Sequence, residues 1–303
     1  MSSTLTVFGW HNVEPTWCFP NSRSGVRGLT RQLRQLRRWA NVLPLGEALD
    51  ALSHGEPLPP RAVALCWDDG YRDNLDLAVP ILEELELPGT FFLVPGLLSG
   101  ERHAWWEVAG WAFARSTVDR VRWRGHDLPT RDGTTWASYT RASDILRSLT
   151  HATRQEALDE LVDRLAPTGH AGDGTMFLDW DGARRLVARG FEVGSHTMRH
   201  LNLAAEAPDH QVEDLRGSRE ILEAELDVPI GLVAYPFGQR DAVSVTTQTA
   251  AAEAGYAHAL TTQAGCNRPG TSATGMHRIM LDPAAGFVAT GVTRIVNRVQ
   301  RRR

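Results

Sequence analysis

The sequence of 303 residues contains no lysine, only three cysteines and no hydrophobic run of transmembrane length. All 32 basic side chains are therefore arginine, which we attribute to codon usage rather than to function. Cys18, Cys66 and Cys266 are odd in number and far apart, which argues against a disulfide framework or a cysteine-based zinc site. Because no basic stripe precedes the terminal arginines, the sequence predicts no nucleic-acid-binding surface.

The N-terminus also lacks the basic start and the apolar stretch of a signal peptide. We therefore expect a cytoplasmic protein, without a segment of the roughly 20 apolar residues that a transmembrane helix needs. Peripheral contact with anionic lipid is one explanation for a group of C-terminal arginines, and a solvated helix end is another. These residues are Arg294, Arg298, Arg301, Arg302 and Arg303.

Hydrophobic residues make up 42% of the chain and charged residues 22%, which is ordinary for a globular protein. Short apolar runs alternate with segments of helical periodicity, and this alternation predicts parallel strands in an α/β barrel. The predicted strands are 5–10, 62–67, 90–94, 191–194, 232–235, 256–260 and 277–281. The predicted helices are 28–39, one through Leu77 and Leu85, 180–188, 212–226, 246–254 and 288–299.

Residues from about 100 to 175 interrupt the alternation, and we expect a long, partly helical insertion within one domain that spans 1–303. A turn at 131–133 and a helix near Arg154–Leu165 are its recognisable parts. Tryptophan is concentrated there, and its flat ring suits either a core or the face of a sugar. Six of the ten tryptophans fall in or just after it: Trp105, Trp106, Trp111, Trp123, Trp136 and Trp180.

Four motifs follow predicted strands directly. They are Trp10-His11-Asn12, Asp68-Asp69-Gly70, His196-Thr197-Met198-Arg199-His200 and Tyr235-Pro236-Phe237-Gly238. In a (β/α) barrel the carboxyl ends of the strands meet at one rim, where active sites form. The shared position of the motifs therefore predicts one site.

The residue types at this rim indicate metal-assisted hydrolysis. On one helical turn His196 and His200 would point the same way, and two imidazoles with a carboxylate are a common zinc set. Of two neighbouring carboxylates, one can ligate while the other acts as a base. The turn with Pro236 and Gly238 could present a backbone N–H to an oxyanion.

Each motif also has a plainer explanation. Asp-Asp-Gly is typical of a turn, and a His-x-x-x-His pair is typical of a solvated helix face. Two histidines and a carboxylate also form the triad of non-heme iron oxygenases, although that chemistry has no use for a second carboxylate.

Together the motifs resemble the polysaccharide deacetylase family (NodB homology, carbohydrate esterase family four). The resemblance implies a distorted (β/α)7-type barrel and a divalent metal, expected to be zinc. It makes Asp69, His196 and His200 the metal ligands and Asp68 the general base.

The chain departs from the family pattern in two places. The family's arginine falls on Ala234 and its tyrosine on Phe237, where the backbone oxyanion donor survives the change; Arg278 is a candidate substitute for the arginine. The C-terminal histidine motif is missing, but Phe8–Val13 is similar to the first strand of the permuted poly-N-acetylglucosamine deacetylases. By that likeness His11 is the general acid.

The resemblance implies removal of N-acetyl groups from an N-acetylated saccharide, a glycolipid or a glycosylated metabolite. An O-acetyl esterase, another C–N hydrolase on the same fold, or a catalytically inactive carbohydrate-binding homologue are the alternatives.

Overall fold

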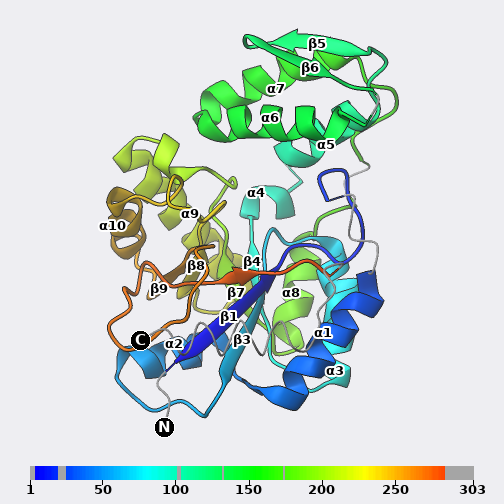
Figure 1. Cartoon of the computed structure of the whole chain (residues 1–303). Helices are drawn as coiled ribbons and strands as arrows, with labels where there is room; N and C mark the ends of the chain where they lie inside the picture. The colour runs from blue at the N-terminus through cyan, green and yellow to red at the C-terminus, as the bar shows by residue number, and fades with distance from the viewer. Residues whose placement is uncertain (1–3, 20–24, 101–103, 132, 173–174, 284–303) are drawn as a thin grey trace.

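A mostly parallel sheet forms the centre of the molecule (Figure 1). The computed structural model describes residues 4–19, 25–100, 104–131, 133–172 and 175–283. The strand order is β10-β1-β3-β4-β7-β8-β9, with β2 also paired to β3. The strands are β1 (Leu5–Trp10), β2 (Asn41–Val42), β3 (Ala62–Trp67), β4 (Thr90–Leu93), β7 (Glu192–Ser195), β8 (Leu232–Ala234), β9 (His258–Leu260) and β10 (Ile279–Met280).

One short segment links the two edges of the sheet. Met276 forms a parallel bridge with Leu260 of β9, and Ile279 and Met280 pair with Phe8 and Gly9 of β1. The sheet therefore curls into a half-barrel surrounded by helices, which confirms the predicted α/β barrel class.

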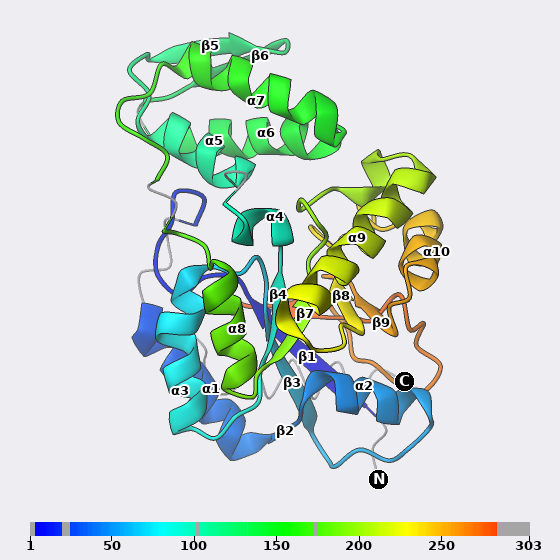
Figure 2. The same cartoon turned by 180° about the vertical axis from the view of Figure 1, so that it is seen from behind.

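Helices cover the outside of this half-barrel, and Figure 2 shows α3 and α8 side by side on one flank with α9 and α10 on the other. They are α1 (Gly25–Trp39), α2 (Leu45–Ser53), the π-helix η1 (Asn74–Ala78), α3 (Val79–Glu84), α4 (Pro95–Leu98), α8 (Trp180–Ala188), the short 3₁₀ turn η2 (Leu203–Ala205), α9 (Pro208–Leu226) and α10 (Val245–Glu253). Within the described ranges no helix is long and apolar enough to cross a membrane.

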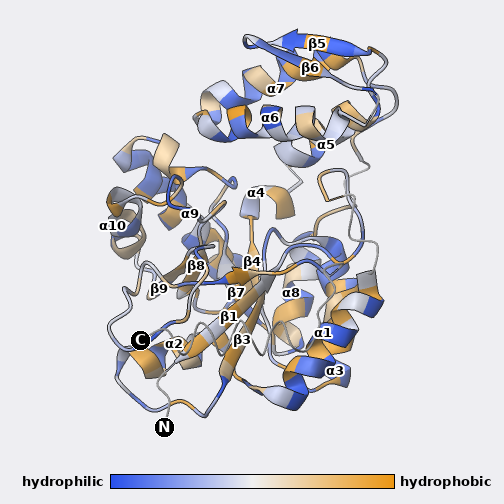
Figure 3. Cartoon of the chain, in the orientation of Figure 1, coloured by the Kyte–Doolittle hydropathy of each residue, from blue (hydrophilic) through white to orange (hydrophobic). Residues whose placement is uncertain are grey.

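Side chains alternate between the inside and the outside of the sheet, as the geometry of a β-strand requires. Along β3 the small residues Ala62, Ala64 and Cys66 belong to the interior cluster, which α2 closes at one end. The larger Val63 and Leu65 face the surrounding helices instead. Strands of the central sheet such as β3 are largely hydrophobic in Figure 3, and every residue of β3 is buried because both faces of the strand are covered.

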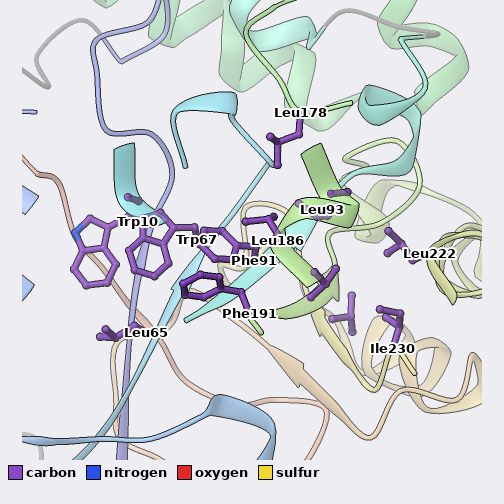
Figure 4. Close-up of a cluster of buried hydrophobic side chains, with 14 of the residues drawn as sticks. Trp10, Leu65, Trp67, Phe91, Leu93, Leu178, Leu186, Phe191, Leu222 and Ile230 are labelled. Carbon is purple, nitrogen blue, oxygen red and sulfur yellow. The ribbon is translucent and has the colours of Figure 1, made fainter. Parts of the chain in front are cut away.

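Trp10 and Trp67 belong to the outer layer. Their rings stack at 5.1 Å, and Phe91 and Phe191 extend this aromatic cluster (Figure 4). From the sequence alone, these two tryptophans could form core or site wall, with core the favoured position. They are core, because the same alternation that buries them turns the following residues, His11 and Asp68, inward.

Local predictions agree with the structure to within a few residues. The bounds of β1, β3 and α8 match the predicted 5–10, 62–67 and 180–188. Helix α2 and strand β2 were not predicted, because nine and two residues are too few for a clear periodicity. The predicted helix 288–299 and the C-terminal arginines lie outside the described residues.

The insertion folds around a hydrophobic cluster of its own and lies over the carboxyl ends of the strands (Figure 1). It is more ordered than the sequence indicated, since the hairpin and two of its helices were not predicted. We call it the cap; it consists of α5 (Trp105–Ala114), β5 (Arg120–Trp123), β6 (His126–Pro129), α6 (Thr135–Ser148) and α7 (His151–Leu165).

Gly194 of β7 lies in a tightly packed part of the barrel interior. An added Cβ would lie 2.5 Å from Phe92 Cε1 and 3.1 Å from the Leu232 carbonyl oxygen. We expect Gly194→Ala to lower the free energy of unfolding by about 1–3 kcal/mol, as overpacked cores do. Gly231→Ala is the control, because its Cβ would meet only Ala257 Cβ at 3.8 Å. Equal urea-denaturation midpoints for the two variants would contradict this packing argument.

Candidate active site

The two adjacent carboxylates at the end of β3 take different directions. Asp68 continues the inward positions of Ala64 and Cys66, whereas Asp69 has a left-handed backbone with φ of 72°. A non-glycine residue in this region stores strain, which is typically found at functional sites. Both side chains are buried, with 1% and 3% exposure. The turn therefore separates the carboxylates, so that each has its own partners.

Asp69 faces both histidines of the second motif. Its Oδ1 lies 3.3 Å from His196 Nε2 and 3.3 Å from His200 Nε2. The expectation that these histidines share one helical turn was wrong. Residues 197–199 form a turn after β7, and Thr197 and His200 have φ of 65° and 51°. The left-handed residues bring the two imidazoles together by a different path.

The three side chains fit a divalent metal. Across the described ranges they form the one group of His, Cys, Asp and Glu whose ligand atoms lie close enough, all within 4.8 Å of one another. The Nδ1 of His196 lies 2.7 Å from the Ala234 carbonyl oxygen, so Nδ1 donates and Nε2 keeps its lone pair. Asp69 Oδ1 is buried without a hydrogen bond of its own. Two imidazole nitrogens and one carboxylate oxygen are the donors of many catalytic zinc sites.

The electrostatics of Asp69 and His200 agree with this fit; burial lowers the pKa of His196, but Asp68 and Asp69 raise it above its ordinary value. Burial raises the pKa of Asp69, but His196 and His200 outweigh that effect and hold it well below its usual range. Burial lowers the pKa of His200 to about 4, which leaves a neutral imidazole at neutral pH. An ionised carboxylate and a neutral imidazole are the forms that bind metals.

Asp68 forms a buried ion pair with Arg278. Arg278 Nη1 donates to Asp68 Oδ1 at 2.6 Å, and Arg278 Nε donates to the Thr261 carbonyl at 3.1 Å. The arginine is fully buried and lies over the ring of Phe92. Burial raises the pKa of Asp68, but Arg278, His196 and His11 together outweigh that effect and lower the pKa below its ordinary value. Asp68 is thus ionised, unligated by the histidines and held in one direction.

A cavity of about 460 Å³ joins these groups to the surface. Its volume is typical of small-molecule sites. It brings together all six residues singled out in the sequence: His11, Asp68, Asp69, His196, His200 and Phe237. His11 is half-buried and stacks on Phe19 at 5.2 Å, and Phe237 has φ of 63° at the end of β8.

The cap supplies the part of the wall that sequence reasoning missed. Tyr139, Ser143 and Arg147 lie one turn apart on α6 and line the cavity. Their helical spacing was visible in the sequence, but nothing local showed that this face of α6 meets the barrel. Trp105 and Trp106 line the cavity too, each with less than 9% exposure.

Trp106 is attached to the barrel rather than free to stack on a ligand. Its ring lies 4.1 Å from that of His200, and its Nε1 donates to Tyr71 Oη at 2.9 Å. Tyr71 in turn donates to the buried Glu107 at 2.7 Å, and the Cys18 thiol donates to the same carboxylate at 2.9 Å. This buried network joins the cap to the turn after Asp69. Trp105 remains the tryptophan of the cap that faces the cavity without such a bond.

The Asp68–Arg278 pair can be tested by stability. We expect Arg278→Met to lower the free energy of unfolding by about 3–5 kcal/mol, because it leaves a buried carboxylate uncompensated. The double variant Asp68→Asn/Arg278→Met should recover most of this loss in urea denaturation. Arg34→Met is the control: its pair with Glu84 is exposed, and about 1 kcal/mol or less is expected there. Additive losses in the double variant would show that the two side chains do not interact.

Comparison with known proteins identifies the family of the chain. The family model described as polysaccharide deacetylase matches residues 55–259, about two thirds of the chain. A curated protein of Bacillus subtilis (strain 168), named "Putative polysaccharide deacetylase YxkH", is 24% identical over 108 residues; the match covers 36% of this chain and 38% of that protein.

Solved structures share the fold over nearly the whole chain. The Streptococcus pyogenes deacetylase PplD, in complex with acetate, has a TM-score of 0.65 at 16% identity, covering 98% of this chain and 99% of that one. A de-N-acetylase from Aggregatibacter actinomycetemcomitans has a TM-score of 0.62 at 17% identity, covering 96% and 99%. By the family match, the chain belongs to the polysaccharide deacetylase family.

Proposed function

We propose that the chain is a metal-dependent hydrolase that removes N-acetyl groups from an N-acetylated sugar. The observation that carries this proposal is that the two adjacent carboxylates have different partners. Asp69 faces two imidazole nitrogens, whereas Asp68 is ionised and held apart by Arg278. Metal-assisted hydrolysis of an amide uses a Lewis acid and a separate base, and this site has residues for each.

Each residue has a role in the proposed reaction. Zinc held by Asp69, His196 and His200 would polarise the acetyl carbonyl and acidify water. Asp68 accepts the proton of the attacking water, and Arg278 keeps its carboxylate turned toward the cavity. The backbone N–H of Phe237 donates to the developing oxyanion, and His11 donates a proton to the leaving nitrogen. That last step matters because, without this proton, the nitrogen would have to leave as an unstable amide anion.

The lining of the cavity supports a sugar as the substrate. Aromatic side chains of Phe19, Trp105 and Tyr139 line it together with the polar Asp144 and Gln239. Aromatic rings cover the apolar faces of sugars, while polar groups bind their hydroxyls. One related structure is that of a de-N-acetylase, and another holds acetate, the product of acetyl removal.

Experiments distinguish the proposed N-deacetylase from the alternatives on the same fold. An O-acetyl esterase would release acetate faster from O-acetylated than from N-acetylated glycans. An inactive carbohydrate-binding homologue would bind sugars and release none, but the paired carboxylates and the complete ligand set argue against it. The cytoplasmic location expected from the sequence stays a prediction, as does an intracellular saccharide, glycolipid or glycosylated metabolite as the substrate.

The assignment predicts how the carboxylate and imidazole variants differ. Asp68→Asn should retain bound zinc but lose about 10²–10⁴-fold in kcat, because only the base is removed. His196→Ala should lose both metal and activity. Acetate release from a panel of N-acetylated saccharides, measured by mass spectrometry beside metal content, checks both. Asp76→Asn, at an exposed position, is the control. Undiminished turnover of Asp68→Asn would overturn the proposal.

The role of His11 predicts a dependence on the leaving group. His11→Ala should lose about 10²–10⁴-fold on an N-acetyl saccharide, whose amine needs a proton. On para-nitrophenyl acetate, whose phenolate leaves without one, the same variant should retain its rate, whereas Asp68→Asn loses both activities. An equal loss of His11→Ala on the two substrates would remove His11 from the role of general acid.

A further inference from the structure

The loop that carries His11 contains no regular secondary structure. Residues 11–19 follow β1 without helix or strand, and His11 itself is only half-buried. A general acid must lie within hydrogen-bond reach of the leaving group, and a misplacement of about 1 Å can cost on the order of 100-fold in rate. The loop therefore needs support from elsewhere in the fold.

That support comes from two adjacent residues that follow the Asp-Asp-Gly turn. Asn74 Nδ2 donates to the His11 carbonyl oxygen at 2.8 Å. Asp73 Oδ2 accepts from the backbone N–H groups of Val13 at 2.7 Å and Glu14 at 2.9 Å. Three side-chain hydrogen bonds thus grip the main chain of the loop on both sides of Asn12.

The side chains of Asp73 and Asn74 are themselves held in place by hydrogen bonds. Asn74 Nδ2 also donates to Asp73 Oδ1 at 3.1 Å, and the Asn74 backbone N–H donates to the Tyr71 carbonyl at 3.0 Å. Asn74 is fully buried and opens the π-helix η1. Such π turns are rare and occur mostly at functional sites. Asp73 and Asn74 are therefore connected to the turn that carries the proposed base, Asp68, and the proposed metal ligand Asp69.

We infer that Asn74, together with Asp73, is a positioning residue for His11. Neither lines the cavity, so both act through the main chain of the loop. We call Asp73 and Asn74 the clamp. The clamp keeps the imidazole of His11 in a constant position relative to Asp68. This inference rests on the proposed role of His11 as general acid.

The clamp is tested by the same pair of substrates. In Asn74→Ala the kcat on an N-acetyl saccharide should fall about tenfold or more, by less than in His11→Ala, while para-nitrophenyl acetate is hydrolysed within twofold of the wild-type rate. A purely structural defect would lower both rates together. The double variant His11→Ala/Asn74→Ala should be no slower than His11→Ala alone, because the clamp acts only through that side chain.

Asp73→Ala keeps the test available if the loss of the buried Asn74 prevents folding. Asp73 is only partly buried, and the variant should show the same selective loss. The control is Asp76→Ala in the same π turn, where the exposed side chain pairs only with Arg185 at 3.7 Å. It should leave both rates unchanged.

The outcomes separate this inference from the proposed function. Equal losses on both substrates in the Asp73 and Asn74 variants, or additive losses in the double variant, overturn the clamp while His11→Ala keeps its selectivity. If His11→Ala itself shows no selectivity, the general-acid role fails and the clamp fails with it.

Discussion

The constraint on which the site depends is the burial of two adjacent carboxylates. Removing an ionised group from water costs several kcal/mol unless other charges and hydrogen bonds compensate for it. Arg278 neutralises Asp68 directly, at 2.6 Å. Asp69 has no arginine and faces two imidazole nitrogens instead. The negative charge of Asp68 is thus neutralised, whereas that of Asp69 remains beside two imidazole nitrogens. A carboxylate and two nitrogen donors in this arrangement stabilise a divalent cation.

The compensating groups also show why the barrel must close. Arg278 lies in the short segment that runs from the bridge with β9 to the pairing with β1. The contact that joins the two edges of the sheet therefore delivers the guanidinium to the interior. Arg278 directly precedes β10 and reaches Asp68, which follows β3, from that position. The segment that completes the sheet therefore also orients the carboxylate of Asp68.

The cap shapes the site without belonging to the half-barrel. It has its own hydrophobic cluster, and the β1–α1 loop contributes Cys18 to it. The network of Glu107, Tyr71 and Trp106 fastens the cap beside His200. Long connections at the carboxyl end of a barrel are where enzymes of this architecture vary their specificity. The cap supplies six of the seventeen residues that line the cavity, so substitutions in it are expected to change which substrate fits.

The sequence by itself determined the strands and the motifs at their ends, but not which side chains of those motifs point inward. The strands and motifs are local properties: apolar runs bounded by turn residues define a strand, and a period of two then places successive side chains on opposite faces. His11 and Asp68 point inward for the same reason that Trp10 and Trp67 pack outward. Only the tertiary structure decided the rest. The Asp68–Arg278 pair joins residues 210 positions apart, the two histidines converge through left-handed turn residues rather than a helix, and the cap meets the rim through buried hydrogen bonds. No local pattern encodes such contacts, because each depends on which distant segments share the same interior.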